Sequence, residues 1–217
     1  MKQAAWILEQ ARSYAYQTLH EESSGHDWWH IVRVTNTALE IARQENANLF
    51  ICELAALLHD VADAKLNESE AAGLQKVSQW LDAHQVALDD AKHVLHIIAN
   101  MSFKGGHHLA EPLTLEGQIV QDADRLDAIG AIGIARAMCY SGHTGRPIHD
   151  PAKMPRETLT VDEYRSGNDT AIMHFYEKLL KVKDRMNTRY AKQLAAKRHQ
   201  FLEVYLEQFY CEWDGKC

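Results

Sequence analysis

The pair His59-Asp60 is the strongest chemical signal in the sequence. It stands near the end of the run LFICELAALLHDVA, Leu49 to Ala62, which is apolar around almost the whole circumference of a helix. An ionised carboxylate in such surroundings is costly unless it is paired, hydrogen-bonded or bound to a metal ion. Adjacent helical residues project about 100° apart, so the pair can meet an ion lying between them but cannot complete its coordination shell. Other segments must therefore supply ligands.

His30 is the third ligand that the pattern favours. It begins a stripe with Val34, Ala38 and Ile41, which marks the core-facing side of a helix. A buried histidine needs a partner, and the alternative to a metal ion is a backbone carbonyl that accepts a hydrogen bond from the ring. We expect His30 to turn toward the same ion as His59.

The fourth ligand is expected from the segment IVQDADRLDAIGAIG. Asp122 and Asp124 are two residues apart, roughly 200° around a helix, so they cannot both point inward. Asp124 shares a stripe with Val120 and Ala131, whereas Asp122 groups with the polar Gln118. We choose Asp124. Asp122 stays the alternative ligand, and otherwise we expect it to be solvated or to contact one of the ligands.

Two imidazoles and two carboxylates form a mixed nitrogen and oxygen site. Such a site suits manganese, magnesium, iron, cobalt or zinc better than a thiophilic metal, and we expect one divalent ion. With four protein ligands, an octahedral ion would keep open positions for water and substrate oxygens. A binuclear site remains an alternative, with His93 or His96 joined by His107.

These motifs resemble those of the HD phosphohydrolase superfamily, and most closely the small bacterial HD-domain nucleotide pyrophosphohydrolases. The likeness lies in the ordered arrangement H...HD...D, and it extends to MSFKGG, to SGNDTAIMHFYEKLL and to the long C-terminal helices. The resemblance implies cleavage of nucleoside triphosphates or related small nucleotides to monophosphate and pyrophosphate. It also implies His30, His59, Asp60 and Asp124 as metal ligands, which leaves His26 a capping or supporting role.

Asp63 is the acidic group that the resemblance places beside the metal. It stands four residues after His59 and three after Asp60, so one helical face could present all three. In the hypothetical mechanism the metal ion lowers the pKa of a bound water and polarises a phosphoryl oxygen, while Asp63 orients or deprotonates the nucleophile. Positive side chains near the motifs would bind the phosphates or, for Lys65, assist catalysis, and each could instead be a solvated or structurally paired charge. They are Lys65, Lys104, Arg33 and Arg125.

Other functions remain open at this point. HD-type phosphodiesterases and phosphomonoesterases use related sites, and elsewhere among HD proteins a binuclear iron centre performs oxygenase chemistry. A nucleotide sensor without turnover belongs to a different class, and a ligand that protects the fold yet stays intact would reveal it.

The elements that must position these residues are helices, because apolar residues recur at intervals of three and four and no alternating strand pattern stands between turn signals. We expect an all-α, single-domain HD-type helix bundle over residues 1–217, with a metal-binding core at about 20–140 and C-terminal helices at about 156–214 that pack on it. The helices are expected at about 3–20, 28–44, 49–62, 68–85, 89–101, 114–140 and 168–212, the last as more than one helix, and a long loop at 141–155. Asp27 can cap the second of these helices. The glycines of GAIG, residues 130–133, lie inside a helical pattern and are expected to allow close packing of helices.

Composition excludes several classes of protein. Hydrophobic residues make up 46% and the formal net charge is -7, which disfavours a surface that neutralises a nucleic-acid backbone. No apolar stretch approaches the length of a membrane span, and the N-terminus lacks the apolar core of a secretory signal. The four cysteines lack CxxC spacing, so we expect reduced thiols and a cytoplasmic monomer or homodimer that binds a small phosphorylated substrate.

Overall fold

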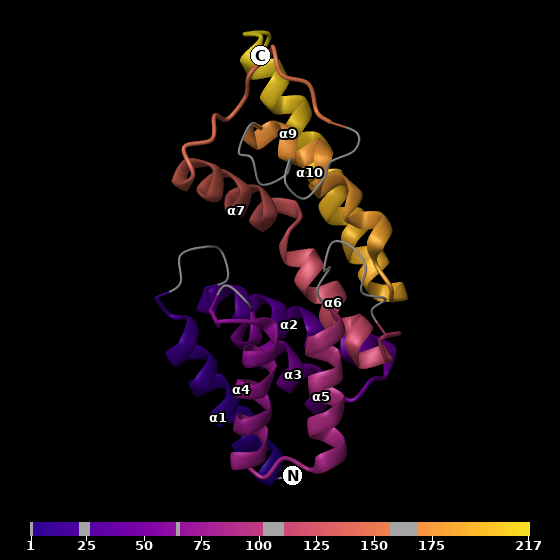
Figure 1. Ribbon diagram of the computed structural model, residues 1–217. Coiled ribbons are helices and arrows are strands. Elements are labelled where there is room, and N and C mark those ends of the chain that lie inside the picture. The colour runs from indigo at the N-terminus through magenta and orange to yellow at the C-terminus, as the bar shows by residue number, and fades with distance from the viewer. Residues whose placement is uncertain (1, 22–26, 64–65, 102–110, 157–168) are drawn as a thin grey trace. The chain divides into compact units, whose positions relative to one another are not determined.

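Helices build all of the regular structure that can be described. The computed structural model describes residues 2–21, 27–63, 66–101, 111–156 and 169–217, and no strand occurs in these ranges (Figure 1). The all-α prediction is confirmed. None of the helices in these ranges is both long and apolar enough to cross a membrane.

The elements are α1 (Lys2–Leu19), α2 (Trp28–Glu45), α3 (Leu49–Leu58), the 3-10 helix η1 (His59–Ala62), α4 (Glu70–Ala83), α5 (Leu88–Met101), α6 (Leu115–Asp127), α7 (Gly130–His143), α9 (Ala171–Glu177), η2 (Leu179–Lys181), η3 (Lys183–Arg185) and α10 (Arg189–Trp213).

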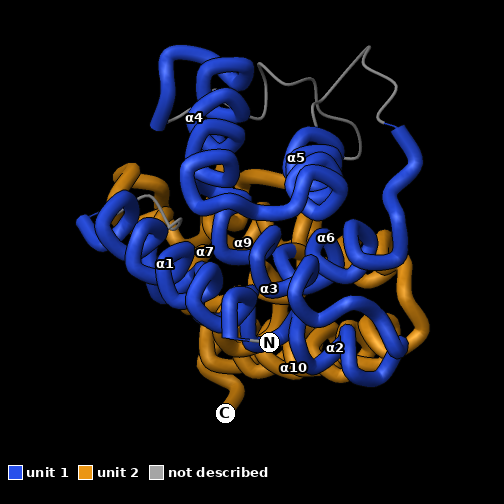
Figure 2. Tube along the Cα trace, turned by 90° about the horizontal axis from the view of Figure 1, so that it is seen from below, with its two compact units in different colours: residues 1–124 blue, residues 125–217 orange. Residues whose placement is uncertain are grey.

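The chain divides into two compact units, Met1–Asp124 and Arg125–Cys217 (Figure 2). The first contains α1 to α5 and most of α6, and the second contains the end of α6 and all later helices. The expectation of one domain over residues 1–217 stays a prediction.

Helix α3 is the centre of the first unit. Seven of its residues are buried, from Ile51 to Leu58, and the helix contacts α1, α2 and α5. Burial of a leucine or isoleucine side chain contributes roughly 1.5–3 kcal/mol, so this helix supplies a large share of the unit's stability. The next residues, His59 and Asp60, are thereby carried into the interior at its C-terminal end.

Polar caps set where α2 and α3 begin. Asp27 caps α2 as predicted, and its Oδ1 accepts a hydrogen bond of 2.8 Å from the backbone N–H of His30. Asn48 caps α3 by accepting from the N–H groups of Phe50 and Ile51 at 3.1 and 3.3 Å. Such caps satisfy N–H groups that the first helical turn leaves unpaired. They fix the start of both helices that lead to the candidate site.

The predicted helix over residues 114–140 is wrong as a single element, because it breaks between α6 and α7. Gly130 starts α7 with φ +75°, a left-handed conformation that glycine adopts without steric cost. A Cβ at Gly133 would overlap the carbonyl oxygen of Ala128. The two glycines therefore allow a sharp break, and Gly130 also lets Arg198 of α10 come close, in line with the predicted close packing of helices.

The second unit is built around α7, α9 and α10, with α7 in contact with both of the others. Residues 144–156 form the predicted loop, although α7 extends three residues into it. Two buried ion pairs brace this region. Arg146 Nε lies 2.9 Å from Asp169 Oδ1, and Arg156 binds Glu177 through Nε and Nη2 at 2.8 and 3.0 Å.

The four cysteines do not all behave as predicted. Cys211 and Cys217 form a disulfide, which contradicts the expectation of four reduced thiols. Cys52 is a free buried thiol, and burial together with the nearby Glu116 carboxylate raises its pKa to about 12. Cys139 is free and exposed. Cys211 lies near the end of α10 and Cys217 just beyond the turn that follows it. Their proximity depends on that turn, and the absence of CxxC spacing did not indicate it.

Candidate metal centre

Residues from two helical segments place two imidazoles in the interior of the first unit. His30 lies in the first turn of α2 and is completely buried. His59 and Asp60 form the start of η1, where the α-helix tightens into a 3-10 turn, and they are 8% and 5% exposed. The ring centroids of His30 and His59 are 5.5 Å apart. Two histidines from distant stretches therefore meet beside a buried carboxylate.

The His59 ring is held in one orientation. Its Nδ1 atom lies 2.8 Å from the carbonyl oxygen of Ala56, so Nδ1 carries the proton and donates it. The Nε2 atom is then left with its lone pair. Within the described part of the chain this buried Nε2 makes no hydrogen bond. An imidazole fixed through one nitrogen, with the other pointing into a polar cluster, is the usual arrangement of a histidine that binds a metal ion.

The potential ligand atoms of His30, His59 and Asp60 all lie within 4.8 Å of one another. The two oxygens of Asp60 face different rings, Oδ2 at 3.4 Å from His30 Nε2 and Oδ1 at 3.2 Å from His59 Nε2. Asp124, from the last turn of α6, brings Oδ1 to 3.4 Å from His30 Nε2. His30, His59 and Asp60 thus form the compact group, and Asp124 contacts it through the His30 ring. Two nitrogens and the carboxylates of Asp60 and Asp124 are a donor set that fits a divalent cation of the manganese, iron, magnesium or zinc type.

Asp124 is the most accessible member of the cluster, with a side chain that is 40% exposed. Burial raises the pKa of its carboxyl group and the Asp60 carboxylate acts in the same direction. The hydrogen bond with His30 and the charges of His59 and His30 outweigh both, so the pKa lies below its ordinary value. The group is therefore ionised at neutral pH, as a metal ligand must be.

Comparisons with known proteins show the family to which the chain belongs. A model of the HD domain family matches residues 28–129. The chain is 43% identical over 201 residues to the uncharacterized protein YpgQ of Bacillus subtilis, a match that covers 92% of this chain and 90% of YpgQ. The chain belongs to the HD domain family. HD domains bind divalent metal ions, and the cluster around His30, His59 and Asp60 is the candidate site for one.

Solved HD structures have the same fold. A crystal structure of an HD-superfamily hydrolase from Bacillus thuringiensis matches with a TM-score of 0.80 and 48% identity, over 98% of this chain and 99% of that one. The crystal structure of Bacillus subtilis YpgQ in complex with ADP matches with a TM-score of 0.78 and 37% identity, over 97% and 96%. The prediction of HD-superfamily membership is therefore confirmed.

Asp122 differs from what the helical pattern predicted. Its side chain is fully buried, so a solvated carboxylate is excluded, and the other expectation, that Asp122 contacts one of the ligands, stays a prediction. Asp124 is only partly buried, yet it is Asp124 whose oxygen lies beside the His30 ring. The reason is that α6 is covered on more than one side, with Ile119, Ala123 and Leu126 also at or below 1% exposure. Burial alone therefore does not tell which of the two aspartates lies beside His30.

Asp63 does not share a helical face with the HD pair. The 3-10 helix ends at Ala62, and Asp63 has extended backbone angles of -59° and 134°. The geometric argument for a common face is therefore wrong, because the helix stops one residue too early. Asp63 remains tied to the site by its backbone, since its N–H donates to the carbonyl oxygen of Asp60 at 3.1 Å.

The basic residues named from the sequence fall into two groups. Lys65 and Lys104 lie outside the described residues. Arg33 is half-buried on α2, one turn after His30. Arg125 donates from Nη1 to the backbone carbonyl oxygen of Arg185 at 2.5 Å, so part of its hydrogen-bonding capacity serves the main chain and not a carboxylate.

The histidines considered for a second ion have protein partners nearby. His93 Nε2 lies 2.7 Å from the Thr114 hydroxyl and 3.7 Å from Glu116. His96 contacts the Pro112 carbonyl oxygen and the Glu111 carboxylate. His107 lies outside the described residues. In the described part of the chain, the cluster of His30, His59 and Asp60 is the one group of three potential ligands found close together.

The sequence pattern did not indicate two residues that support the turn carrying His59 and Asp60. The side-chain amide of Asn67 donates to the carbonyl oxygens of Val61 and Asp63 at 2.9 and 2.8 Å, which ties down the end of η1. Gly73 lets α4 approach η1, because a Cβ there would overlap the carbonyl oxygen of Ala62. Both act on backbone atoms, and a periodicity of side chains contains no signal for such contacts.

Proposed function

We propose that this HD-domain protein is a metal-dependent phosphohydrolase that cleaves nucleoside triphosphates, or related small nucleotides, to a monophosphate and pyrophosphate. The observation that carries the proposal is the convergence of two imidazole nitrogens and two carboxylates, with His59 oriented by Ala56 and Asp60 facing both rings. The fold of HD-superfamily hydrolases and the ADP bound to the related YpgQ support it.

In this proposal His30, His59, Asp60 and Asp124 hold one divalent cation. A bound cation would polarise a phosphoryl oxygen and lower the pKa of a coordinated water. The protein's contribution is to keep both rings and both carboxylates fixed before substrate arrives. The hydrogen bond from His59 Nδ1 and the cap on α2 do this for the two histidines. The exposed edge of Asp124 leaves the cluster open to solvent.

The proposed reaction breaks the bond between the α-phosphorus and the oxygen that bridges to the β-phosphorus. Water adds to the α-phosphorus, pyrophosphate leaves, and the products are the nucleoside monophosphate, pyrophosphate and a released proton. Asp63 is the proposed general base that orients the water or accepts its proton. Its backbone is held by hydrogen bonds with the Asp60 carbonyl oxygen and the Asn67 side-chain amide.

Positive charge must balance the triphosphate in this proposal. Lys65 and Lys104 follow directly on the second motif and on α5, and we propose Lys104 for phosphate binding and Lys65 for assistance at the reacting centre. Arg33 and Arg125 are the further proposed phosphate-binding residues. A cationic side chain near a transferring phosphoryl group stabilises the charge that develops there.

A substrate screen tests the function. Metal-stripped protein is assayed with nucleoside triphosphates, nucleoside diphosphates, phosphodiesters and phosphomonoesters, each with manganese, magnesium, iron, cobalt or zinc, and both pyrophosphate and orthophosphate are quantified. We expect pyrophosphate and monophosphate in equal amounts, and no turnover without metal. In water labelled with oxygen-18 the label is expected in the monophosphate.

Several outcomes would contradict the proposal. Turnover that persists in the presence of a strong chelator would show that the reaction does not need a metal ion. Orthophosphate as the sole product, or oxygen-18 label in the pyrophosphate, would show that water attacks a phosphorus other than the α-phosphorus. A nucleotide that raises the melting temperature and remains intact after long incubation identifies a sensor and not a hydrolase.

A further inference from the structure

The last turn of α6 carries Asp124 and also ends the helix. The final carbonyl groups of an α-helix have no partner within the helix, so their orientation depends on donors from elsewhere. Here the last turn includes the carbonyls of Leu126 and Asp127, two and three residues after Asp124, and the Leu126 carbonyl accepts a backbone hydrogen bond of 3.3 Å from Ile129, just after the helix. Any group that fixes these carbonyls also limits how far the turn can fray or rotate.

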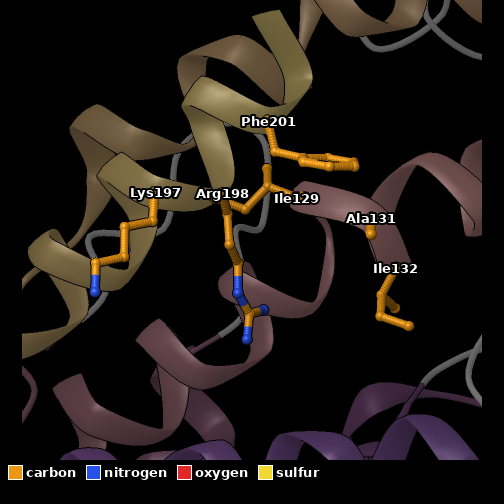
Figure 3. Close-up of a pocket in the computed structure, with 7 residues that line it drawn as sticks. Ile129, Ala131, Ile132, Lys197, Arg198 and Phe201 are labelled. Atoms are coloured by element: carbon orange, nitrogen blue, oxygen red, sulfur yellow. The ribbon is translucent and has the colours of Figure 1, made fainter. Parts of the chain in front are cut away.

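Arg198, on α10, provides one of these donors. Its Nη1 atom donates to the carbonyl oxygen of Leu126 at 2.5 Å. Figure 3 shows its guanidinium reaching away from α10, whereas the neighbouring Lys197 points in another direction. Burial lowers the pKa of Arg198, which the Asp127 carboxylate partly offsets. A cation at the C-terminal end of a helix is favoured by both hydrogen bonding and the helix dipole.

Gly130 provides the room for this contact. A Cβ built at Gly130 would come within 3.0 Å of Arg198 Cγ and 3.1 Å of Arg198 Cβ, so the aliphatic part of the arginine packs directly on the glycine. The positive φ of Gly130 also turns the chain from α6 into α7. A pocket of about 290 Å³ lies here, lined by the start of α7 and by Arg198, Lys197 and Phe201 (Figure 3).

Arg136, on α7, reinforces the same turn. Its Nη1 atom donates to the backbone oxygen of Asp127 at 3.2 Å and to Asp127 Oδ2 at 2.9 Å. The Asp127 side chain is 4% exposed and that of Arg136 26%, so the carboxylate of this pair is shielded from water. Charge-assisted hydrogen bonds of this kind are stronger than neutral ones. Two guanidinium groups, from α7 and α10, thus hold adjacent carbonyls at the end of α6, and all of these residues belong to the second unit.

We propose that Arg198 is a positioning residue of the candidate metal centre, which holds the last turn of α6 and thereby keeps the Asp124 carboxylate beside His30. The action passes along a single helix, from the Leu126 carbonyl back to Asp124. The inference rests on the proposed role of Asp124 as a ligand. It gives the C-terminal helix a part in metal binding, although α10 contributes none of the four proposed ligands.

A double-mutant cycle tests this, with Zn²⁺ alone as the probe and no nucleotide present. The affinity for Zn²⁺ is measured by competition with a chelating dye for wild type, Arg198→Met, Asp124→Ala and the double variant. Methionine keeps an apolar chain over Gly130 and removes the donor. We expect Arg198→Met to weaken binding about tenfold, as loss of a group that orients a ligand does. In the Asp124→Ala background the same change should have no further effect.

Matched variants separate positioning from a general loss of stability. Lys197→Met removes a neighbouring charge on the same helix, and we expect wild-type affinity. Arg198→Lys keeps a cationic donor and should recover part of the loss. Arg136→Met should weaken binding in the same direction as Arg198→Met. If Arg198→Met cannot be purified in a folded state, Arg198→Lys and Arg136→Met enter the same cycle with the same criterion.

Two results would overturn the inference. One is an unchanged Zn²⁺ affinity in folded Arg198→Met, and the other is an equal loss in the presence and absence of Asp124. Failure of the underlying metal site looks different, since Asp124→Ala would then bind Zn²⁺ as tightly as wild type. Failure of the proposed hydrolysis leaves these affinities untouched, because no nucleotide enters the measurement.

Discussion

His30 Nε2 lies 3.4 Å from Asp124 Oδ1, so the first turn of α2 meets the last turn of α6. The histidine is completely buried and the aspartate is 40% exposed on its side chain. This pair closes one side of a cluster whose other side is formed by His59 and Asp60. A site with a buried half and an open half can hold a cation firmly while substrate oxygens reach it.

Removal of a proposed ligand is expected to abolish turnover together with metal binding. His59→Ala takes away an imidazole whose ring is already oriented by Ala56, and Asp124→Ala takes away the carboxylate at the open side. Asp63→Ala should retain the metal and lower kcat by about 10²- to 10⁴-fold, which is the usual contribution of a general base. Metal content and steady-state rates are measured on the same preparations.

The control for these variants is His20→Ala. His20 is exposed in the turn that follows α1 and stacks on Tyr16, with no part in the cluster. We expect wild-type metal content and rates for it. Full activity in His59→Ala or Asp124→Ala would show that the ligands have been assigned wrongly.

Loss of the Asn67 amide is expected to destabilise the end of η1. Asn67→Ala removes two hydrogen bonds to backbone carbonyls, which lowers the free energy of unfolding by about 1–3 kcal/mol. Asn67→Asp should cost more, because an acceptor then faces the oxygens of Val61 and Asp63. Urea unfolding measures both. Gln44→Ala, which removes a single exposed side-chain bond to Glu40, is the control and should change stability little.

Because Asn67 also holds the Asp63 backbone, Asn67→Ala should lower kcat more than metal affinity. A loss of metal affinity as large as that of Asp124→Ala would contradict a role confined to the Asp63 turn. Unchanged stability in both Asn67 variants would show that these two hydrogen bonds do not stabilise the end of η1.

Gly73→Ala is expected to be destabilising. Its new methyl group would overlap the Ala62 carbonyl oxygen, so α4 must move away from the turn that carries His59 and Asp60. Overpacking of this kind costs about 1–3 kcal/mol. The matched control is Gly142→Ala on α7, where no heavy atom lies within 4 Å of the new Cβ. There the better helix propensity of alanine should raise stability by up to about 1 kcal/mol. Thermal unfolding distinguishes the two, and equal effects would contradict the packing argument.

His174 is expected to make the protein less stable in mild acid. Burial, together with the charges of Lys178 and Arg146, lowers its pKa from 6.5 to about 4, and Glu177 acts in the opposite direction. The unfolded chain then binds more protons than the folded one between these two values, so stability falls as pH falls from about 6.5 to about 4. The largest contribution is about 3 kcal/mol, at 1.36 kcal/mol for each unit of pKa.

His174→Gln tests this by removing the titrating ring. The difference in unfolding free energy between pH 7 and pH 4.5 should be smaller in the variant than in wild type. Carboxylates such as Glu177 also titrate in acid, so the comparison concerns the difference between the two proteins. Parallel pH profiles would show that His174 has an ordinary pKa.

Much of this architecture follows from the sequence alone, because helix periodicity and burial of apolar side chains are local properties of a pattern. The run from Leu49 to Ala62 predicted a central buried segment that ends in His59-Asp60, and α3 with η1 has this form. Asp27 was readable as a cap because a carboxylate before a helix satisfies its free N–H groups. The residue types and the order of the motifs were enough to predict a mixed-donor metal site and HD-superfamily membership.

Tertiary structure decided the features that depend on backbone atoms of other segments. The helix ends at Ala62, so Asp63 leaves the face that simple spacing gave it, and Asn67 holds it through carbonyl oxygens. The break at Gly130 and the guanidinium on the Leu126 carbonyl likewise have no periodic signal in the sequence. Hydrogen bonds to carbonyls are set by where two chain segments meet in space, and a linear pattern of side chains does not contain that information.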